Sequence, residues 1–255
     1  MKTIVFPSIK GGSGKSSNSI MLSNFLGQAG MRVLCIDMDI NNSMSFYYVS
    51  DAELMDTHSI ADALHSGDLS GNVIPTDQLD NIHIIPSSFH LVNLRAISHM
   101  TLKRMLPQVS ESYDYCIIDS PPTWDNIVLN ALYAADLVIT PVSLAQWDWK
   151  GASFFRDQIV QDLGPEFLER WYLLINYFVR PRTDNPENFT NQLIQLFNDS
   201  FENILPFRIP ETTLVERYID LDEGISKSKR KIKLFSAVQE LVQFVTGSPL
   251  DVEVF

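Results

Sequence analysis

The sequence predicts an α/β fold, a single doubly wound and mostly parallel sheet with helices on both of its faces. Apolar runs of strand length alternate with segments of helical periodicity along most of the 255 residues. Most of these runs are too continuously apolar for strands with one exposed face, so the strands should be buried on both sides. A glycine-rich loop joins the first run to the first helical segment. Such alternation favours βαβ units and parallel pairing.

The expected elements follow one another in order along the chain. Strands are expected at residues 3–6, 32–36, 82–85, 115–118, 137–142, 171–175 and 204–209. Helices are expected at residues 18–28, 59–65, 91–106, 127–134, 151–163, 186–201 and 234–245. No linker composition interrupts this pattern, so we expect one domain over residues 1–255, with a short acidic and apolar tail at 246–255. In such sheets, ligands bind at the carboxyl ends of the strands.

Composition limits the classes of function. The net charge is −12, which argues against a uniformly basic nucleic-acid binder. The two cysteines, Cys35 and Cys116, lie inside apolar runs and do not form a zinc pattern. Buried thiols suit a reducing cytoplasm, where we expect the protein to reside. No apolar stretch reaches the ~18 residues that a membrane span requires.

The glycine-rich loop has the composition of a phosphate-binding loop. Its residues are Lys10, Gly11, Gly12, Ser13, Gly14, Lys15, Ser16 and Ser17. Glycines allow backbone N–H groups to close around phosphate oxygens, and the following helix N-terminus adds partial positive charge. In this arrangement Lys15 can reach the outer phosphates, and the Ser16 hydroxyl can ligate Mg²⁺. The loop therefore predicts a site for a nucleotide.

This loop resembles the deviant Walker A motif of the ParA/MinD family of ATPases. The common form of the loop has glycine where this chain has Ile9, and this chain instead carries a second lysine, Lys10, at the loop entrance. The resemblance extends over roughly residues 2–245 and implies a P-loop NTPase fold, with ATP and Mg²⁺ as cofactors and ATP hydrolysis as the activity. It also implies that Lys10 reaches across a dimer interface to the partner's nucleotide. The homodimer would then form on ATP binding and separate after hydrolysis.

Two carboxylates, Asp37 and Asp39, follow the second apolar run. The family has a matching pair at this strand end. By that resemblance, Asp39 is expected to position the attacking water, and Asp37 is expected to support the Mg²⁺ shell. The family usually continues with Pro-Gln, whereas this chain continues with Ile40, Asn41 and Asn42. The polar partner that follows Asp39 is therefore left open.

A third carboxylate, Asp119, ends the apolar run at 115–118 and precedes Ser120, Pro121 and Pro122. An apolar strand that ends in an aspartate is the Walker B arrangement, which places Asp119 near Mg²⁺, usually through a water molecule. The two prolines fix the direction of the chain after the strand. The family's form of this segment is matched closely.

Two further segments resemble adenine-contacting parts of the family. Asn176 ends the strand expected at 171–175, and its amide can both donate to and accept from the edge of a base. Pro210 lies in the second such segment. An ordinary strand terminus is an equally good interpretation of both.

A basic run lies near the C-terminus. Its five cations are Lys227, Lys229, Arg230, Lys231 and Lys233. A concentrated cationic patch on an acidic body can bind phosphate backbones without sequence preference. Small ParA-type partition ATPases without a helix-turn-helix domain bind DNA in a comparable region, and this chain likewise begins at its first strand. The resemblance thus implies a nucleoid-associated switch that segregates plasmid or chromosomal DNA or positions a protein cargo. A solvated surface turn is the alternative interpretation.

The resemblance also implies a ParB-like adaptor that stimulates hydrolysis. Trp147 and Trp149 follow a strand, in a segment expected to be a loop, and are candidate contacts for it, although half-buried packing also explains them. A MinD-like positioning switch that does not bind DNA is one competing function. Because the tail holds Asp251, Glu253 and Pro249 but no base, we expect no membrane binding. A small-molecule synthetase of the dethiobiotin-synthetase type is the other alternative.

Overall fold

The computed structural model describes residues 1–94, 96–181, 185–211 and 229–248, without the side chains of 229–232. The described strands form one sheet in the order β3-β4-β2-β5-β1-β6-β7-β8. Their bounds are β1 Lys2–Phe6, β2 Val33–Asp37, β3 Ile74–Pro75, β4 Ile82–Ile85, β5 Tyr115–Asp119, β6 Leu137–Val142, β7 Trp171–Phe178 and β8 Ile204–Pro210. All pairings are parallel except β3 with β4. The predicted doubly wound, mostly parallel sheet is confirmed.

The register of the central strands brings three sequence motifs together. Asp119 pairs with Phe6 on one side and with Asp37 on the other. The carboxyl ends of β1, β2 and β5 are therefore level with one another. The loop after β1 and the carboxylates at the ends of β2 and β5 meet at one edge of the sheet, as expected of a parallel α/β sheet.

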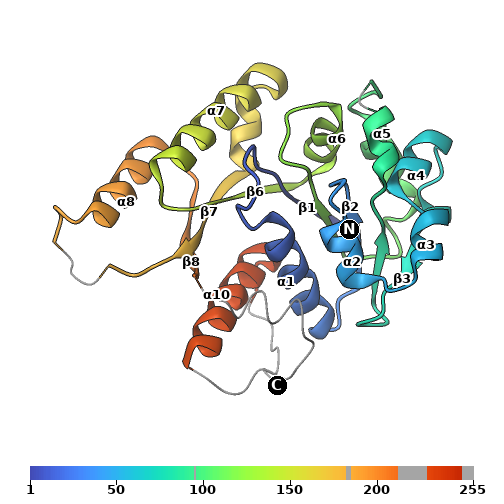
Figure 1. Cartoon of the computed structure of the whole chain (residues 1–255), viewed down its shortest axis with the longest axis horizontal. Coiled ribbons are helices and arrows are strands. Elements are labelled where there is room, and N and C mark those ends of the chain that lie inside the picture. Colours follow the sequence, from blue (N-terminus) through green and yellow to red (C-terminus); the bar gives the residue numbers. More distant parts are fainter. Residues whose placement is uncertain (95, 182–184, 212–228, 249–255) are drawn as a thin grey trace.

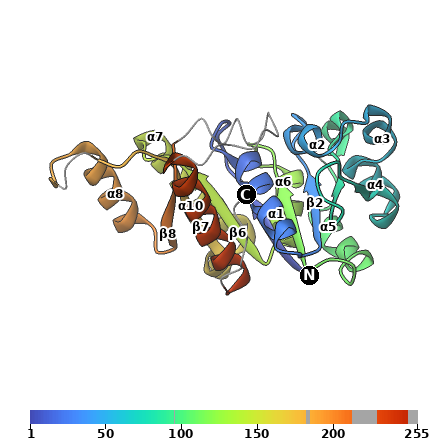
Figure 2. The same cartoon turned by 90° about the horizontal axis from the view of Figure 1, so that it is seen from below.

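Helices cover both faces of this sheet (Figure 1). Their bounds are α1 Lys15–Gln28, α2 Ser43–Tyr48, α3 Ala52–Thr57, α4 Ile60–Ser66, α5 Thr101–Met105, α6 Asn126–Ala134, α7 Gln146–Leu163, α8 Phe189–Ser200 and α10 Lys229–Thr246. One core cluster packs α1, α2 and α10 against the sheet, and a second packs α4 to α8 against the other face. Figure 2 shows α10 beside α1, where the rings of Phe25 and Phe235 lie 5.3 Å apart. None of the described helices is long and apolar enough to span a bilayer.

Strand β1, which lies between the two core clusters, shows why the apolar runs are continuous. In β1, Val5 faces one cluster while Ile4 and Phe6 face the other, and all three side chains are fully buried. Alternate residues of a strand point to opposite faces. Because both faces are covered, each position must be apolar.

The helix expected at 91–106 is wrong as a single element. A short 3-10 helix, Phe89–Leu94, is followed by a turn and then by α5. The carbonyl of Ser98 accepts hydrogen bonds from the backbone N–H and the hydroxyl of Thr101, at 3.1 and 2.8 Å. The Ser98 hydroxyl in turn accepts from the N–H of Met100 at 3.4 Å. Such local bonds compete with a helix and stabilise a turn.

Candidate ATPase site

The phosphate loop spans the gap between β1 and α1. Gly14 has φ 92°, and a β-carbon there would lie 2.1 Å from the Nδ2 atom of Asn176. Glycine is therefore required by both backbone conformation and space. The Ser8 hydroxyl donates to the carbonyl of Lys10 at 2.7 Å and lies 2.9 Å from the Ser13 hydroxyl. These contacts hold the loop open as a cradle before any nucleotide binds.

A cavity of about 290 Å³ lies over this loop. The cavity is lined by the phosphate loop and the start of α1, by the segment after β2 that carries Asp39, and by single residues after β5 and in β7. The lining residues are Gly11, Gly12, Gly14, Lys15, Ser16, Ser17, Ile20, Asp39, Asn41, Ser43, Pro122 and Tyr177. Lys15 is 6% exposed. Burial lowers the pKa of its ammonium group, while Asp119 and Asp39 act in the opposite direction. The cavity thus combines backbone donors, a buried lysine and a carboxylate.

Asp37 is fully buried and makes hydrogen bonds through both carboxylate oxygens. One oxygen accepts from the N–H of Asp39 at 3.0 Å, and the other accepts from the N–H and hydroxyl of Ser45 at 2.9 and 2.7 Å. Burial raises the pKa of Asp37 to about 6, although these hydrogen bonds oppose the rise. Asp37 therefore ties the start of α2 to the backbone that carries Asp39.

Asp39 has a partner that sequence reasoning left open. Its Oδ1 atom accepts from the backbone N–H of Asn41 at 3.0 Å and from the Asn41 amide at 2.9 Å. Asp39 is only 5% exposed, yet it lines the cavity. Asn41 fixes the orientation of the Asp39 carboxylate, so the Ile40-Asn41-Asn42 segment supplies a polar partner.

Asp119 is buried with little compensation. Neither of its carboxylate oxygens has a hydrogen bond of ordinary geometry among the described residues. Burial raises the pKa of this carboxyl well above its usual range, and the neighbouring Asp37 raises it further. The Ser16 hydroxyl and the Lys15 ammonium lower it in part. An ionised group in this position needs a cation nearby.

Lys10 lies outside this cavity. Its Nζ atom forms an ion pair with Asp148 of α7 at 2.8 Å. The Lys10 side chain is 61% exposed and that of Asp148 is 7% exposed. The backbone N–H of Ser143 donates to the other Asp148 oxygen at 3.2 Å, and the Ser143 hydroxyl also donates to it. Gly11 lines the cavity, but Lys10 does not, because its side chain extends to Asp148 instead.

The family profile of the AAA domain matches residues 1–163 of the chain. The sporulation initiation inhibitor protein Soj of Bacillus subtilis is 32% identical over 159 residues, which are 60% of this chain and 62% of Soj. The maintenance of carboxysome distribution protein A of Gloeothece citriformis is 33% identical, over 64% of each chain. A plasmid partition protein of Borrelia burgdorferi, solved with AMPPNP, superposes with a TM-score of 0.78 at 27% identity, covering 96% of this chain and 99% of that chain.

The chain belongs to the ParA/MinD family of ATPases. Its reaction is the hydrolysis of ATP to ADP and phosphate. Phosphoryl transfer depends mostly on positioning and on stabilisation of charge. In this ATPase the loop amides and Lys15 would hold the phosphates, while Asp39, fixed by Asn41, has a carboxylate oxygen to orient a water molecule.

The donor atoms in the site fit Mg²⁺. This ion prefers oxygen ligands and keeps several of its water molecules. The buried oxygens of Asp119 and the adjacent Ser16 hydroxyl are the groups that would hold it. Asp37 would support this shell from behind, since its oxygens are already occupied. When bound, the ion neutralises charge on the β- and γ-phosphates.

The two predicted adenine contacts lie apart from the cavity. The Nδ2 atom of Asn176 donates to the carbonyl of Ser13 at 2.8 Å, so the ATPase uses this amide to brace the phosphate loop. Pro210 ends β8, where it pairs with Phe178, and it does not line the cavity. Contact of either residue with adenine stays a prediction.

The two tryptophans lie on a helix, so the expectation of a loop was wrong. Both belong to the first turn of α7, which begins at Gln146 rather than at the expected residue 151. Trp149 is half-buried, and its indole N–H donates to the hydroxyl of Ser200 at 2.9 Å. Trp147 is 75% exposed, and only the Lys150 ammonium lies over its ring, at 5.0 Å, among the described ring contacts of this residue. Of the pair, Trp147 is the one available to a partner.

The basic run is only partly described. Lys227 lies outside the described residues, and Lys229, Arg230 and Lys231 begin helix α10. Lys233 is exposed on the same helix. The backbone therefore places four of the five cations on consecutive turns of one helix end, next to α1.

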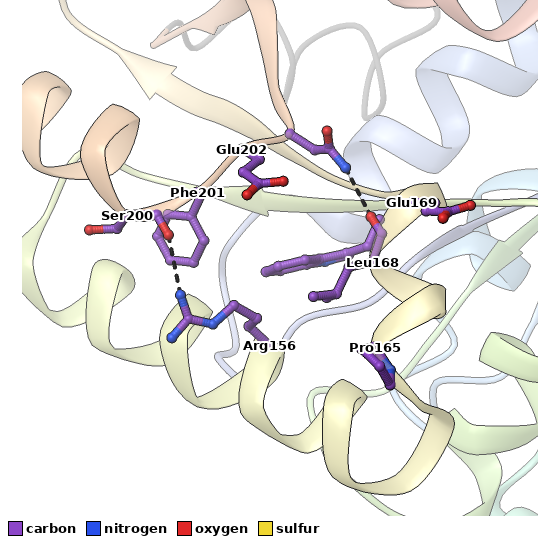
Figure 3. A pocket seen from close by; sticks show the side chains of 9 residues that line it. Arg156, Pro165, Leu168, Glu169, Ser200, Phe201 and Glu202 are labelled. Carbon is purple, nitrogen blue, oxygen red and sulfur yellow. Dashed lines mark hydrogen bonds between the residues drawn. The ribbon is translucent and has the colours of Figure 1, made fainter.

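A larger cavity, of about 530 Å³, lies at the opposite end of the sheet, where β7 and β8 begin (Figure 3). Arg156 of α7 donates to the carbonyl of Ser200 at 3.2 Å there, and Asn203 donates to the carbonyl of Leu168 at 2.9 Å. These polar groups already have protein partners. Because ligands of parallel α/β sheets bind at the carboxyl ends of the strands, we assign the chemistry to the smaller cavity.

The buried carboxyl of Asp37 predicts a pH dependence of stability. Its pKa is about 6 in the folded ATPase and about 4 in an unfolded chain, so the folded state binds more protons between these values. The free energy of unfolding should therefore fall by about 2–3 kcal/mol as the pH rises from 4 to 7. Urea denaturation of the nucleotide-free protein and of Asp37→Asn measures this. A decline of equal size in the variant would contradict the assignment to Asp37.

Proposed function

We propose that this ATPase is a ParA-type partition or positioning switch. ATP binding drives formation of a homodimer, and the dimer binds DNA without sequence preference. Hydrolysis of ATP then releases the protein from the DNA. The observation that carries this proposal is the position of Lys10. This lysine is anchored at the surface on Asp148, outside the phosphate cavity of its own chain, where a second subunit can receive it.

Contacts between α1 and α10 support a link from nucleotide to DNA. Helix α1 begins at Lys15 of the phosphate loop, and α10 begins within the basic run. The two helices pack side by side, with Phe25 against Phe235. A change at the loop can therefore be transmitted to the cationic end of α10 through one packed helix pair.

The charge distribution supports DNA as the ligand of the dimer. The chain has 19 basic and 31 acidic residues, and five of the basic ones lie between residues 227 and 233. On a body of net charge −12, this is the place where a phosphate backbone would be attracted. Association with the nucleoid would follow from it, with a plasmid, a chromosome or a protein assembly as the cargo and a ParB-like adaptor as the stimulator of hydrolysis.

DNA binding should depend on ATP and on salt. If the five cations neutralise five phosphates, the affinity for a non-specific duplex should fall by about 10²–10³ between 50 and 200 mM salt. Fluorescence anisotropy with ATP, ADP and no nucleotide measures this. We expect DNA binding in the presence of ATP but not with ADP or without nucleotide. We expect this binding to be lost in the triple variant Lys229→Ala, Arg230→Ala, Lys231→Ala.

The matched control is the variant Lys103→Ala, Arg104→Ala. These two exposed cations lie on α5, which packs on the other face of the sheet. Their removal should leave DNA binding unchanged. Equal loss in both variants would show general attraction to positive charge rather than a site. No DNA binding in any nucleotide state, with hydrolysis intact, would instead favour a MinD-like protein switch or a small-molecule synthetase.

A further inference from the structure

Tyr177 has a backbone conformation that is unusual for its side chain. Its φ is 53°, in the left-handed region. Among the described residues, Asn42 is the one other non-glycine with positive φ, and asparagine tolerates this region far better than tyrosine does. Both residues lie beside the phosphate cavity or next to a residue that lines it. Strained backbone of this kind concentrates at binding and catalytic sites.

The strain coincides with an extra residue in β7. Ile175 pairs with Arg208 of β8, and Phe178 pairs with Pro210, so β7 advances by three residues where β8 advances by two. Tyr177 lies inside this irregularity. Bulges change the direction of a side chain and are common next to active sites.

The bulge directs two consecutive side chains at the same loop. In a regular strand, Asn176 and Tyr177 would point to opposite faces. Here Asn176 donates to the carbonyl of Ser13, and the phenol oxygen of Tyr177 would lie 3.2 Å from a β-carbon built on Gly14. The first contact braces the loop from behind. The Tyr177 hydroxyl lies close to Gly14, and both residues line the cavity.

The Tyr177 hydroxyl is in reach of a bound nucleotide. The side chain lines the 290 Å³ cavity together with Gly14 and Lys15, and the residue is 40% exposed. The amides of such loops surround the α- and β-phosphates. A phenol O–H is a hydrogen-bond donor, and hydrogen bonds to charged acceptors are among the stronger ones in proteins.

We propose that Tyr177 is a nucleotide-binding residue whose phenol O–H donates to an α- or β-phosphate oxygen of ATP and of ADP. The bulge and the left-handed backbone serve to aim this group. The contact is the same for ATP and ADP, so it contributes to affinity rather than to the hydrolytic step. It requires neither the dimer nor DNA.

The test is the affinity of the protein for Mg²⁺-ADP, measured by calorimetry without DNA. Tyr177→Phe keeps the ring and removes the donor, so the affinity should fall about tenfold. The KM for ATP should rise by a similar factor while kcat stays unchanged. Tyr172→Phe is the control. Tyr172 lies on the same strand with its ring 5.0 Å from that of Phe244, and its hydroxyl should not matter to ADP.

Tyr177→Gly separates binding from structural packing. Glycine adopts positive φ without strain, so this variant should unfold at the same or a higher temperature than the wild type while binding ADP at least tenfold more weakly. Wild-type affinity for ADP in Tyr177→Phe would overturn the proposal. So would a Tyr177→Gly variant that loses stability while Tyr177→Phe binds normally, since the ring would then serve packing. Because ADP is the probe, this measurement does not depend on DNA binding or dimerisation. A failure of the proposed function can therefore be distinguished from a failure of this proposal.

Discussion

Replacing Lys10 with alanine should reduce ATP hydrolysis by about 10³-fold or more while leaving most of the affinity for ATP, because in the proposed dimer the charge of Lys10 acts on the partner's phosphates. A cation delivered in this way stabilises charge mainly in the transition state, so the loss appears in kcat. Lys10 is bound to Asp148 in the isolated chain and does not line its own cavity, so its removal leaves the binding cradle intact. Steady-state hydrolysis and an ATP-binding titration measure the two effects. Lys150→Ala, an exposed lysine on the first turns of the same α7, is the charge-matched control and should retain activity.

Mixing two inactive variants tests whether Lys10 acts across an interface. Lys10→Ala retains its own Asp39, and Asp39→Ala retains Lys10. In a mixed dimer, one of the two sites would hold both groups. Random pairing should therefore restore about a quarter of the wild-type rate. No recovery on mixing, with dimer formation verified by sedimentation, would show that Lys10 serves its own chain.

Replacing Asp119 with asparagine should stabilise the nucleotide-free protein and abolish hydrolysis. The Asp119 carboxylate is fully buried, and neither of its oxygens has a hydrogen bond of ordinary geometry among the described residues. Asparagine carries no charge that must be buried, so the substitution should raise the free energy of unfolding by about 1–3 kcal/mol. Hydrolysis should fall by about 10²-fold or more, since the shell of the Mg²⁺ ion loses its charged member. Chemical denaturation and a phosphate-release assay provide the two readouts.

Asp148→Asn is the matched control for this prediction. Asp148 is also buried, but its oxygens accept from Lys10 and Ser143. The same substitution there should leave stability unchanged or lower it, because it removes satisfied interactions. Mg²⁺ should also raise the denaturation midpoint of the wild type and leave that of Asp119→Asn unchanged. A less stable Asp119→Asn protein would contradict the idea that burial of this carboxylate costs more free energy than its neighbours return.

The parts of the site that derive from local sequence were predictable. The loop at 10–17, Asp37, Asp39 and Asp119 each lie at the end of an apolar strand, and the parallel register brings these strand ends together. The positions of the strands were also predictable, because burial on both faces of the sheet requires continuous apolar runs. Short segments such as β3 and α2 were missed, since six residues or fewer carry too little periodicity to be recognised.

The supporting contacts were not predictable because they depend on tertiary structure. Nothing in the sequence near Lys10 indicates Asp148, which lies 138 positions away. Ser45 binds Asp37 only because α2 folds back onto the end of β2. The orientation of Tyr177 depends on a bulge, and an extra residue in a pairing cannot be seen until the partner strand is known. Asn41 is the exception, since an aspartate side chain readily accepts from the backbone N–H two residues further on and so forms a local turn.

The position of β1 has a consequence for biosynthesis. This strand is synthesised well before its two neighbours in the sheet, which are β5, starting at Tyr115, and β6, ending at Val142. Synthesis must therefore pass Val142 before the phosphate loop has both supporting strands beside it. Pairings this distant in sequence form slowly, and unpaired apolar strands invite aggregation. A nascent chain of this protein should depend on chaperones until β6 is complete, and it should gain its capacity to hold nucleotide abruptly at that length.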